Sequence, residues 1–334
     1  MYENRIQSRG EAEKLGPETY KDKTLGLFES VRKNKLEVKL VSKIFGVIVT
    51  YKPDVVILEK CIHSLKNQLD KVIIVDNTHG GCEKLESFKT FPNLEVIYLK
   101  DNYGIAYAQN VGIKKALENN ADYILLSDQD TVYPPDFVEK MLECFKEEEI
   151  AACGPLFIDA NTGRKQFFIK KGLFGFKRFY PTSGKHEVLQ LIASGTILNS
   201  RYLSYIGLMK EDLFIDWVDM EWCWRAVKKG YKIIGNADVK ILHKHGEKSI
   251  RFFSKNVTLK SPLRHYYTIR NGTYLALRNS NLDIPHRVIL FLKTFRNIFL
   301  FALLSKPHLI HLKYTVLGFW HGITGKSGEL NEAH

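Results

Sequence analysis

Two carboxylates follow an apolar segment near the middle of the chain. Asp128 and Asp130 come directly after residues 123–127, Tyr-Ile-Leu-Leu-Ser, and only Gln129 separates them. Ionised acids are costly to bury unless they are paired or bind a metal. One of these acids can face a ribose and the other a divalent cation, because Mg²⁺ and Mn²⁺ prefer oxygen ligands and share them with substrate phosphates. A solvated turn is the alternative, but the preceding apolar segment favours a binding site.

A second group of acids stands among large aromatic residues. Asp216 and Asp219 lie close in sequence to Trp217 and Trp222. On a helix, two acids three positions apart share a face. Aromatic neighbours lower the local polarity and raise the proton affinity of a carboxylate, which suits a general base. The alternative is that these acids only favour the positive end of a helix dipole.

Two weaker signals accompany the acids. His243 follows a short apolar segment, where an imidazole can bind a metal or a diphosphate, although a lone histidine is more often structural. Residues 102–112 contain small side chains at positions 104, 106, 108 and 112. These allow a close backbone approach, and the helix expected to follow presents its amide groups to an anion. The alternative is a glycine turn into a tightly packed helix.

These residues need a scaffold, and the first half of the chain alternates β-branched apolar runs with helical periodicity. Such alternation predicts a parallel, doubly wound sheet, which binds ligands at the carboxyl ends of its strands. One crevice is therefore expected to hold Thr50, Tyr51, Asp76 and Asp128. The predicted strands are residues 43–50, 71–77, 94–99 and 123–128, and the predicted helices are residues 55–67, 107–119 and 134–145.

The second half of the chain has a mixed pattern. Residues 165–180 alternate aromatic and basic side chains, as strands or as a long loop. Strands are expected at 188–199, 231–234 and 239–242, and helices at 217–229, 262–279 and 285–321. Residues 1–42 are polar and predict a loose extension with a short helix near 25–32.

The composition limits the function classes. Of 334 residues, 49 are Lys or Arg and 37 are Asp or Glu, a net charge of +12, and 45% are hydrophobic. That apolar content excludes intrinsic disorder. The charge leaves nucleic acid, an anionic membrane or an anionic substrate as partners, but no nucleic-acid-binding motif is present. A P-loop and the dinucleotide-binding glycine motif are also absent. The five scattered cysteines predict free thiols.

The C-terminal segment, residues 285–334, carries six Lys or Arg among apolar residues. Its most apolar stretch is interrupted by Lys293, Arg296 and Asn297, so an amphipathic helix is expected rather than a transmembrane one. Such a helix suits the anionic inner leaflet of a membrane; packing on the rest of the chain is the alternative. Residues 1–25 lack a secretory signal, which predicts a cytoplasmic protein, peripheral at the inner face of the cell membrane.

The order of these motifs resembles the family 2 glycosyltransferases of the A-type, Rossmann-like fold. The likeness covers about residues 43–280, and three motifs resemble the rhamnosyltransferase subgroup: D-Q-D, F-I-D-x-V-D-x-E-W-C and S-P-x-R-x-Y-Y. The matching segments are residues 47–51, 75–77, 102–106, 109–112, 128–130, 193–195, 214–223, 243, 261–267 and 270–271.

The resemblance implies a domain organisation and site roles. Residues 1–42 would be an extension, 43–280 the catalytic domain (43–150 its nucleotide-binding half, 151–280 its acceptor and catalytic half) and 281–334 a basic helical tail. The nucleotide would be bound by Thr50, Tyr51, Asp76, Asn102, Gly104, Asn110 and Asp128, and Asp76 would accept a hydrogen bond from a pyrimidine N3–H. The metal ion, Mg²⁺ or Mn²⁺, would be bound by Asp128, Asp130 and His243.

The resemblance also implies the reaction. Asp219 would be the base, or else Asp216, because many relatives have Glu-Asp where this chain has Val218-Asp219. The enzyme would be an inverting, metal-dependent glycosyltransferase of cell-surface polysaccharide biosynthesis. Its donor would be dTDP-β-L-rhamnose and its acceptor a lipid-linked or polysaccharide glycan. The alternatives are a UDP-sugar donor such as UDP-galactofuranose, a basic nucleic-acid-binding protein, and a non-catalytic scaffold, against which the intact acids argue.

Overall fold

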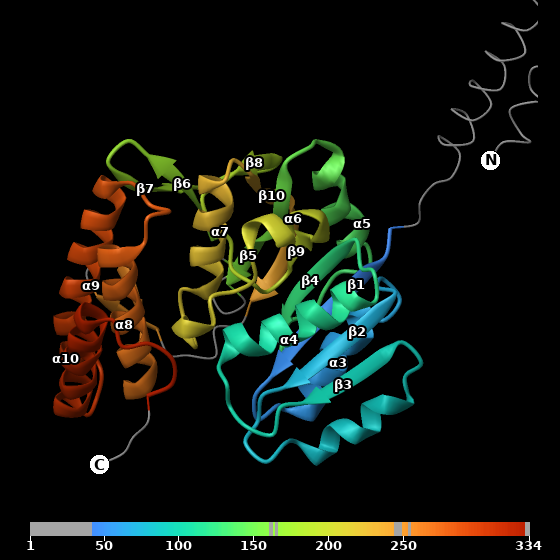
Figure 1. Cartoon of the computed structure of the whole chain (residues 1–334), viewed down its shortest axis with the longest axis horizontal. Coiled ribbons are helices and arrows are strands. Elements are labelled where there is room, and N and C mark those ends of the chain that lie inside the picture. Colours follow the sequence, from blue (N-terminus) through green and yellow to red (C-terminus); the bar gives the residue numbers. More distant parts are fainter. Residues whose placement is uncertain (1–41, 160–162, 164–165, 244–248, 253–254, 331–334) are drawn as a thin grey trace, which may run out of the picture. The chain divides into compact units, whose positions relative to one another are not determined.

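A mostly parallel sheet forms the centre of the computed structural model, which describes residues 42–159, 163, 166–243, 249–252 and 255–330 (Figure 1). The helix predicted near 25–32 lies outside these residues. The described sheet has the order β3-β2-β1-β4-β9-β5-β10-β8, in which β9 and β8 are antiparallel to their neighbours. Its strands are β1 (Ile44–Thr50), β2 (Lys71–Asp76), β3 (Leu94–Tyr98), β4 (Tyr123–Asp128), β5 (Ile150–Asp159), β8 (Lys185–Glu187), β9 (Thr196–Asn199) and β10 (Lys232–His243).

Helices cover both faces of the first four strands, as the alternation predicted. Strand β1 is buried along its whole length, because Val47 and Val49 pack in one apolar cluster with α4 (Ile105–Glu118) and Ile44 and Ile48 in another with α3 (Val55–Leu65). A Cβ added to Gly112 of α4 would lie 2.3 Å from Cγ1 of Val47, so the glycine is needed for close packing. The crossovers are completed by η1 (Glu83–Thr90), α5 (Phe137–Leu142) and η2 (Glu143–Lys146).

The second half differs from the sequence predictions in its strands. Strand β5 was not predicted, since its sequence includes Gly154 and Pro155. A proline cannot donate to the ladder, and Pro155 lies beside the register shift in β10 between Asn236 and Lys240. The register shift lies within the single strand β10, whereas the sequence predicted two separate strands, at 231–234 and 239–242. The hairpin of β6 (Phe168–Gly172) and β7 (Gly175–Phe179) confirms the expected strands at 165–180.

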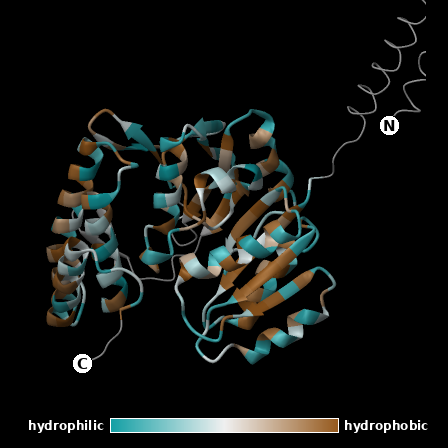
Figure 2. Ribbon diagram, viewed as in Figure 1, coloured by the Kyte–Doolittle hydropathy of each residue, from teal (hydrophilic) through white to brown (hydrophobic). Residues whose placement is uncertain are grey.

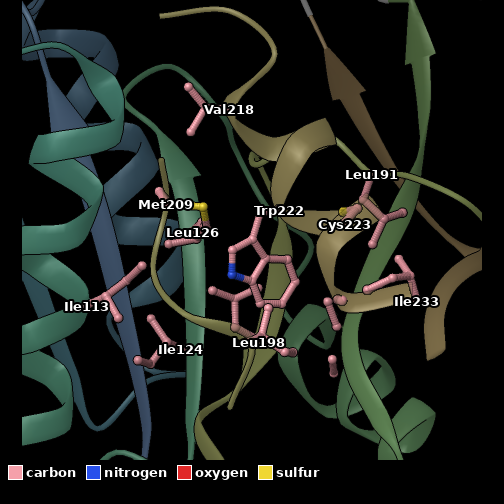
Figure 3. Close-up of a cluster of buried hydrophobic side chains, with 14 of the residues drawn as sticks. Ile113, Ile124, Leu126, Leu191, Leu198, Met209, Val218, Trp222, Cys223 and Ile233 are labelled. Atoms are coloured by element: carbon pink, nitrogen blue, oxygen red, sulfur yellow. The ribbon is translucent and has the colours of Figure 1, made fainter. Parts of the chain in front are cut away.

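The two halves share a core around α7 (Val218–Lys228). Figure 3 shows the Trp222 indole beside Leu198 of β9, with Met209 and Leu126 nearby. Its ring N–H donates to the carbonyl of Gly207, 2.8 Å away, just after α6 (Ser200–Ile206). This packing fixes the start of α7 relative to the end of β4.

Three helices end the described chain: α8 (Pro262–Arg278), α9 (Ile284–Leu304) and α10 (His308–Thr324). The single helical segment expected at 285–321 is therefore two helices, separated by Ser305, Lys306 and Pro307. Proline favours an extended residue before it, which ends the first helix. Both α9 and α10 pack against α8. No helix in the described part of the chain is long and apolar enough to cross a membrane.

Two further expectations were wrong. Cys144 of η2 and Cys153 of β5 form a disulfide, whereas free thiols were expected. Sequence spacing did not reveal this pair, because the packing of η2 against β5 brings the two together. Asp216 also lies outside α7, which begins at Val218. It therefore does not share a helix face with Asp219.

Candidate active site

The carboxyl ends of β1, β2 and β4 bring the predicted nucleotide-binding residues together. Thr50 is directly opposite Asp76 in the sheet, and Val49 is opposite Asp128. Tyr51 follows β1, and its backbone N–H donates to the Gln129 side chain at 2.9 Å. The expected crevice edge is thus formed by adjacent parallel strands.

The Asp76 carboxylate is fully buried and accepts four hydrogen bonds. One oxygen accepts from the hydroxyls of Thr50 (3.1 Å) and Thr78 (2.7 Å) and from the Thr78 N–H (3.3 Å). The other accepts from the Cys82 N–H at 2.7 Å. These bonds hold the loop after β2 in place, so Asp76 organises this wall of the crevice.

The two acids after β4 lie in different environments. Asp128 is half-buried, and its N–H lies 3.4 Å from the Ser194 hydroxyl, whereas Asp130 is exposed. Burial raises the pKa of Asp128 to about 6, and the nearby Asp130 carboxylate adds to the shift. Arg264 acts on the same carboxyl in the opposite direction. The arrangement combines two close anions with one cation from α8.

The small-residue segment is used for close packing. Gly104 has φ +84°, and a Cβ there would lie 2.5 Å from the Phe214 carbonyl oxygen. Asn102 accepts from the Asn77 side chain at 2.9 Å, beside the end of β2. Asn110, in contrast, is buried and bonded to the loop at Met209: it donates to that carbonyl (2.9 Å) and accepts from that N–H (2.8 Å).

The backbone between η3 (Glu211–Leu213) and α7 is strained. Phe214 has φ 61° and ψ −65°, and the Ile215 N–H lies 2.6 Å from the Leu213 carbonyl, which is the geometry of the rare positive-φ γ-turn. Asp216 and Trp217 follow with φ of 64° and 69°. Such conformations cost roughly 1–3 kcal/mol each and persist only when surrounding contacts enforce them.

Helix α8 supplies those contacts. The Asn271 amide nitrogen lies 2.8 Å from the carbonyls of Leu213 and Ile215 and 3.1 Å from that of Asp216. Arg270 donates to the Leu213 carbonyl (3.0 Å) and to the Asn271 side-chain oxygen (2.8 Å). The strained turn is thereby held by two consecutive residues of one helix.

Asp216 is the centre of a charged cluster rather than a free base. Its carboxylate accepts from Lys260 Nζ (2.8 Å), from Arg264 Nη2 (2.8 Å) and Nε (3.2 Å), and from the Thr268 hydroxyl (3.0 Å). Burial alone would raise the pKa of Asp216, but Lys260 and Arg264 outweigh burial and lower it to about 2. A carboxylate held in this way is a weak proton acceptor.

Asp219, in the first turn of α7, has the opposite electrostatics. One oxygen accepts from the Ala193 N–H (3.1 Å) and the other from the Met220 N–H (2.9 Å). Burial raises the pKa of Asp219 to about 6, and the Asp128 charge contributes to that shift. The segment 193–194 therefore links the two carboxylates, because Ala193 bonds Asp219 and Ser194 lies beside Asp128.

Some site features were found by sequence and others were not. The acids at 128, 130, 216 and 219 were predicted. The contacts of Ser194, Arg264 and Asn271 were missed, although all three lie in the matched segments, because their partners are distant in sequence. His243 ends β10, but its side chain lies outside the described atoms. No cluster of three or more metal-binding side chains occurs among the described residues.

Comparisons with known proteins agree with this geometry. Residues 47–203 match the family described as Glycosyl transferase family 2. Over 295 residues the chain is 32% identical to the dTDP-rhamnosyl transferase RfbF of Shigella flexneri, covering 86% of this chain and 97% of that protein.

Two solved structures show the same fold. The structure of S. aureus TarS 1-349 in complex with UDP-GlcNAc is 17% identical with a TM-score of 0.54, covering 84% of this chain and 81% of that one. GalNAc-T7 with UDP, GalNAc and Mn²⁺ is 14% identical with a TM-score of 0.53, covering 83% of this chain. The chain spans 55% of the GalNAc-T7 chain. These identities establish the fold alone.

We expect Asn271→Ala to lower the free energy of unfolding by about 1–3 kcal/mol, because the carbonyls of the strained turn lose their buried donor. Urea denaturation measures this change. Asn119→Ala is the matched control, since among the described residues the Asn119 side chain donates to the Lys115 carbonyl near the end of α4 and not to a strained turn. Equal effects of the two substitutions would contradict the role given to Asn271.

Proposed function

The chain belongs to glycosyl transferase family 2 and is a glycosyltransferase, and from this premise we propose that its donor is dTDP-β-L-rhamnose and its acceptor a hydroxyl of a lipid-linked or polysaccharide glycan. The observation that supports the donor is the 32% identity, over 97% of its length, to a dTDP-rhamnosyl transferase. A UDP-sugar donor is the second candidate, since TarS and GalNAc-T7 were solved with UDP compounds. The proposal includes peripheral contact with an anionic membrane, where a lipid-linked acceptor would lie.

In this proposal the nucleotide lies at the carboxyl edge of β1, β2 and β4. Thr50, Tyr51 and Asp76 surround the base, and Asn102 and Gly104 shape the neighbouring wall. One Asp76 oxygen already accepts three internal bonds, so the other oxygen, which among the described residues accepts only from the Cys82 N–H, is the one assigned to the base N3–H. Because Asp76 is 0% exposed, that contact requires the surrounding loop to move. Asn110 is assigned an indirect role: it holds the loop at Met209 and does not contact the nucleotide itself.

The residues after β4 fit a divalent cation. Asp128 and Asp130 repel each other enough to raise the pKa of Asp128 further, and Mg²⁺ typically combines one or two carboxylates with substrate phosphates. We assign Asp128 and Asp130 as ligands, with His243 at the end of β10 as a further candidate. When bound, Mg²⁺ or Mn²⁺ would neutralise charge on the diphosphate.

The charged cluster on α8 contributes a second source of positive charge. Lys260 and Arg264 both pair with Asp216, and Arg264 also acts electrostatically on Asp128. We assign Arg264 to help stabilise the negative charge that develops on the diphosphate leaving group, since fixed charges of this kind stabilise such transition states.

We assign Asp219 as the base of the transfer step. The acceptor oxygen forms a bond to the anomeric carbon, its proton passes to the Asp219 carboxylate, and the bond from that carbon to the diphosphate oxygen breaks to release dTDP. A single displacement inverts the anomeric configuration. The raised pKa of Asp219 supports this role over Asp216, whose pKa is lowered to about 2.

A pocket of about 170 Å³, which is lined by Met220, the residue that follows Asp219, is assigned to the acceptor sugar. It is smaller than the roughly 300–1,000 Å³ of typical ligand pockets, which suits a single pyranose ring. Ile192 and Met220 line it, and they are the chain neighbours of Ala193 and Asp219. Its other walls combine apolar and amide side chains, as binding the two faces of a sugar requires: Leu156, Phe167, Gln166 and Gln190.

We expect the purified chain to release dTDP from dTDP-β-L-rhamnose in the presence of Mn²⁺ or Mg²⁺ and extracted glycan acceptors. Activity should fall on chelation and return with added metal. The readout is nucleoside diphosphate release across a panel that includes UDP-galactofuranose and UDP-GlcNAc. If a UDP-sugar is turned over faster than dTDP-β-L-rhamnose, the proposed donor is wrong. If chelation leaves turnover unchanged, the proposed metal dependence is wrong.

We expect transfer activity to decline as the pH falls through about 6, because protonated Asp219 no longer accepts a proton. A divalent cation bound at Asp128 would favour the ionised form of that carboxyl, so the acid limb is assigned to Asp219. Asp219→Asn should lower kcat by about 10²–10⁴-fold. Asp216→Asn should keep the acid limb while raising the donor KM, since it disturbs Arg264. Loss of that limb in Asp216→Asn, with activity retained in Asp219→Asn, would transfer the base assignment to Asp216.

We expect Ile192→Trp to raise the acceptor KM by about tenfold or more by filling the pocket that Ile192 and Met220 line. The assay uses methyl α-L-rhamnopyranoside as acceptor probe, with its binding followed by ligand-observed NMR. Ile323→Trp is the control, because Ile323 has a similar exposed fraction, 37% against 36%, at the end of α10. Unchanged probe binding in Ile192→Trp would place the acceptor elsewhere.

A further inference from the structure

Helix α9 is apolar on its outward face and partly polar on its buried face. His286 and Thr294 are among its buried residues, with exposed fractions of 2% and 3%. Helices of water-soluble proteins show the reverse pattern. The exposed apolar residues recur every three or four positions and form one stripe: Ile284, Val288, Leu292, Phe295, Phe299 and Leu303.

Helix α10 has the same inverted pattern. Its buried residues are His311, Thr315, Gly318 and Gly322. A Cβ on Gly318 would lie 2.6 Å from the Tyr266 carbonyl oxygen of α8, and a Cβ on Gly322 2.7 Å from that of Arg270. Small residues that permit such close helix contact are typical of helix pairs packed in lipid.

The outward faces of the two helices carry large apolar side chains. The rings of Phe295 on α9 and Phe319 on α10 lie 5.7 Å apart and connect the two helices. In Figure 2 hydrophobic brown segments recur along both ribbons. On α10 the exposed apolar residues are Leu309, Ile310, Leu312, Val316, Trp320 and Ile323. Exposed apolar patches of this extent mark interaction sites.

The charges beside this surface identify its partner. From 283 to 330 the chain has two acids, Asp283 and Glu329, and six basic residues: Arg287, Lys293, Arg296, Lys306, Lys313 and Lys326. A second copy of the same surface would bring like charges together, whereas anionic lipid headgroups complement them.

We propose that α9 and α10 form a membrane-docking hairpin that lies in the interface of an anionic bilayer, with its apolar outward side chains among the acyl chains. Four exposed basic residues would meet the headgroups: Arg296, Lys306, Lys313 and Lys326. The hairpin lies in the plane of the membrane, consistent with the absence of a membrane-spanning helix among the described residues. Because α8 carries both this hairpin and the Arg264, Arg270 and Asn271 contacts, docking places the transferase site beside the membrane surface.

The full chain should float with phosphatidylglycerol-containing vesicles and much less with pure phosphatidylcholine. Brominated acyl chains should quench Trp320, whereas Trp222 and Trp224 are 1% exposed in the core. Trp320→Asp should weaken vesicle binding by about tenfold or more, because a large apolar side chain no longer enters the bilayer. Tyr205→Asp, on an equally exposed aromatic of α6, should not.

The test needs no donor or acceptor, so it is independent of the sugar assignment. A second measurement, quenching in Trp320→Phe, should lose the brominated-lipid signal even if Trp320→Asp folds poorly. Wild-type protein that stays unbound with anionic vesicles would overturn the proposal. So would a dimer that Trp320→Asp dissociates while vesicle binding is unchanged, since the surface would then be an interface between two copies.

Discussion

The Asn271 side chain, together with Arg270, holds the strained turn that precedes α7. Its amide nitrogen meets the carbonyls of Leu213, Ile215 and Asp216, and without such contacts the consecutive positive-φ residues would relax. The turn sets where α7 begins and therefore where Asp219 points. It also directs Asp216 to α8. The two acids, three residues apart, have different partners and opposite pKa shifts: Lys260 and Arg264 lower the pKa of Asp216, and burial raises that of Asp219.

The two carboxylates Asp216 and Asp219 have pKa values shifted in opposite directions, because their neighbours differ. Where cations accompany the acid, as at Asp216, the charge is retained and the carboxylate becomes a fixed structural element. Where only backbone N–H groups accompany it, as at Asp219, burial dominates and raises the pKa toward the range useful for proton transfer. The segment 193–194 lies between the two carboxyls with raised pKa values, since the Ala193 N–H donates to Asp219 at 3.1 Å and the Ser194 hydroxyl lies 3.4 Å from the Asp128 N–H.

The C-terminal hairpin of α9 and α10 is connected to the active site through α8. Helix α8 is shared between the active-site contacts and the seam with α10, where Gly318 and Gly322 allow backbone contact. Helix α8 therefore lies between the charged cluster at Asp216 and the apolar outward surface of α9 and α10. The net charge of +12, which alone could indicate nucleic acid, includes six basic residues in the segment that carries this apolar surface.

The sequence by itself determined the parallel sheet, the strand ends with Asp76 and Asp128, and the acids of the site, because buried parallel strands and their terminal carboxylates are local patterns. It did not determine β5, where Gly154 and Pro155 obscure the strand signal, or the pairing of Cys144 with Cys153. Nor did it distinguish Asp219 from Asp216, since that difference comes from Lys260, Arg264 and Ala193, which are distant in sequence. Only tertiary structure decided which acid is neutralised and which faces of α9 and α10 are exposed, because both depend on what packs against α8.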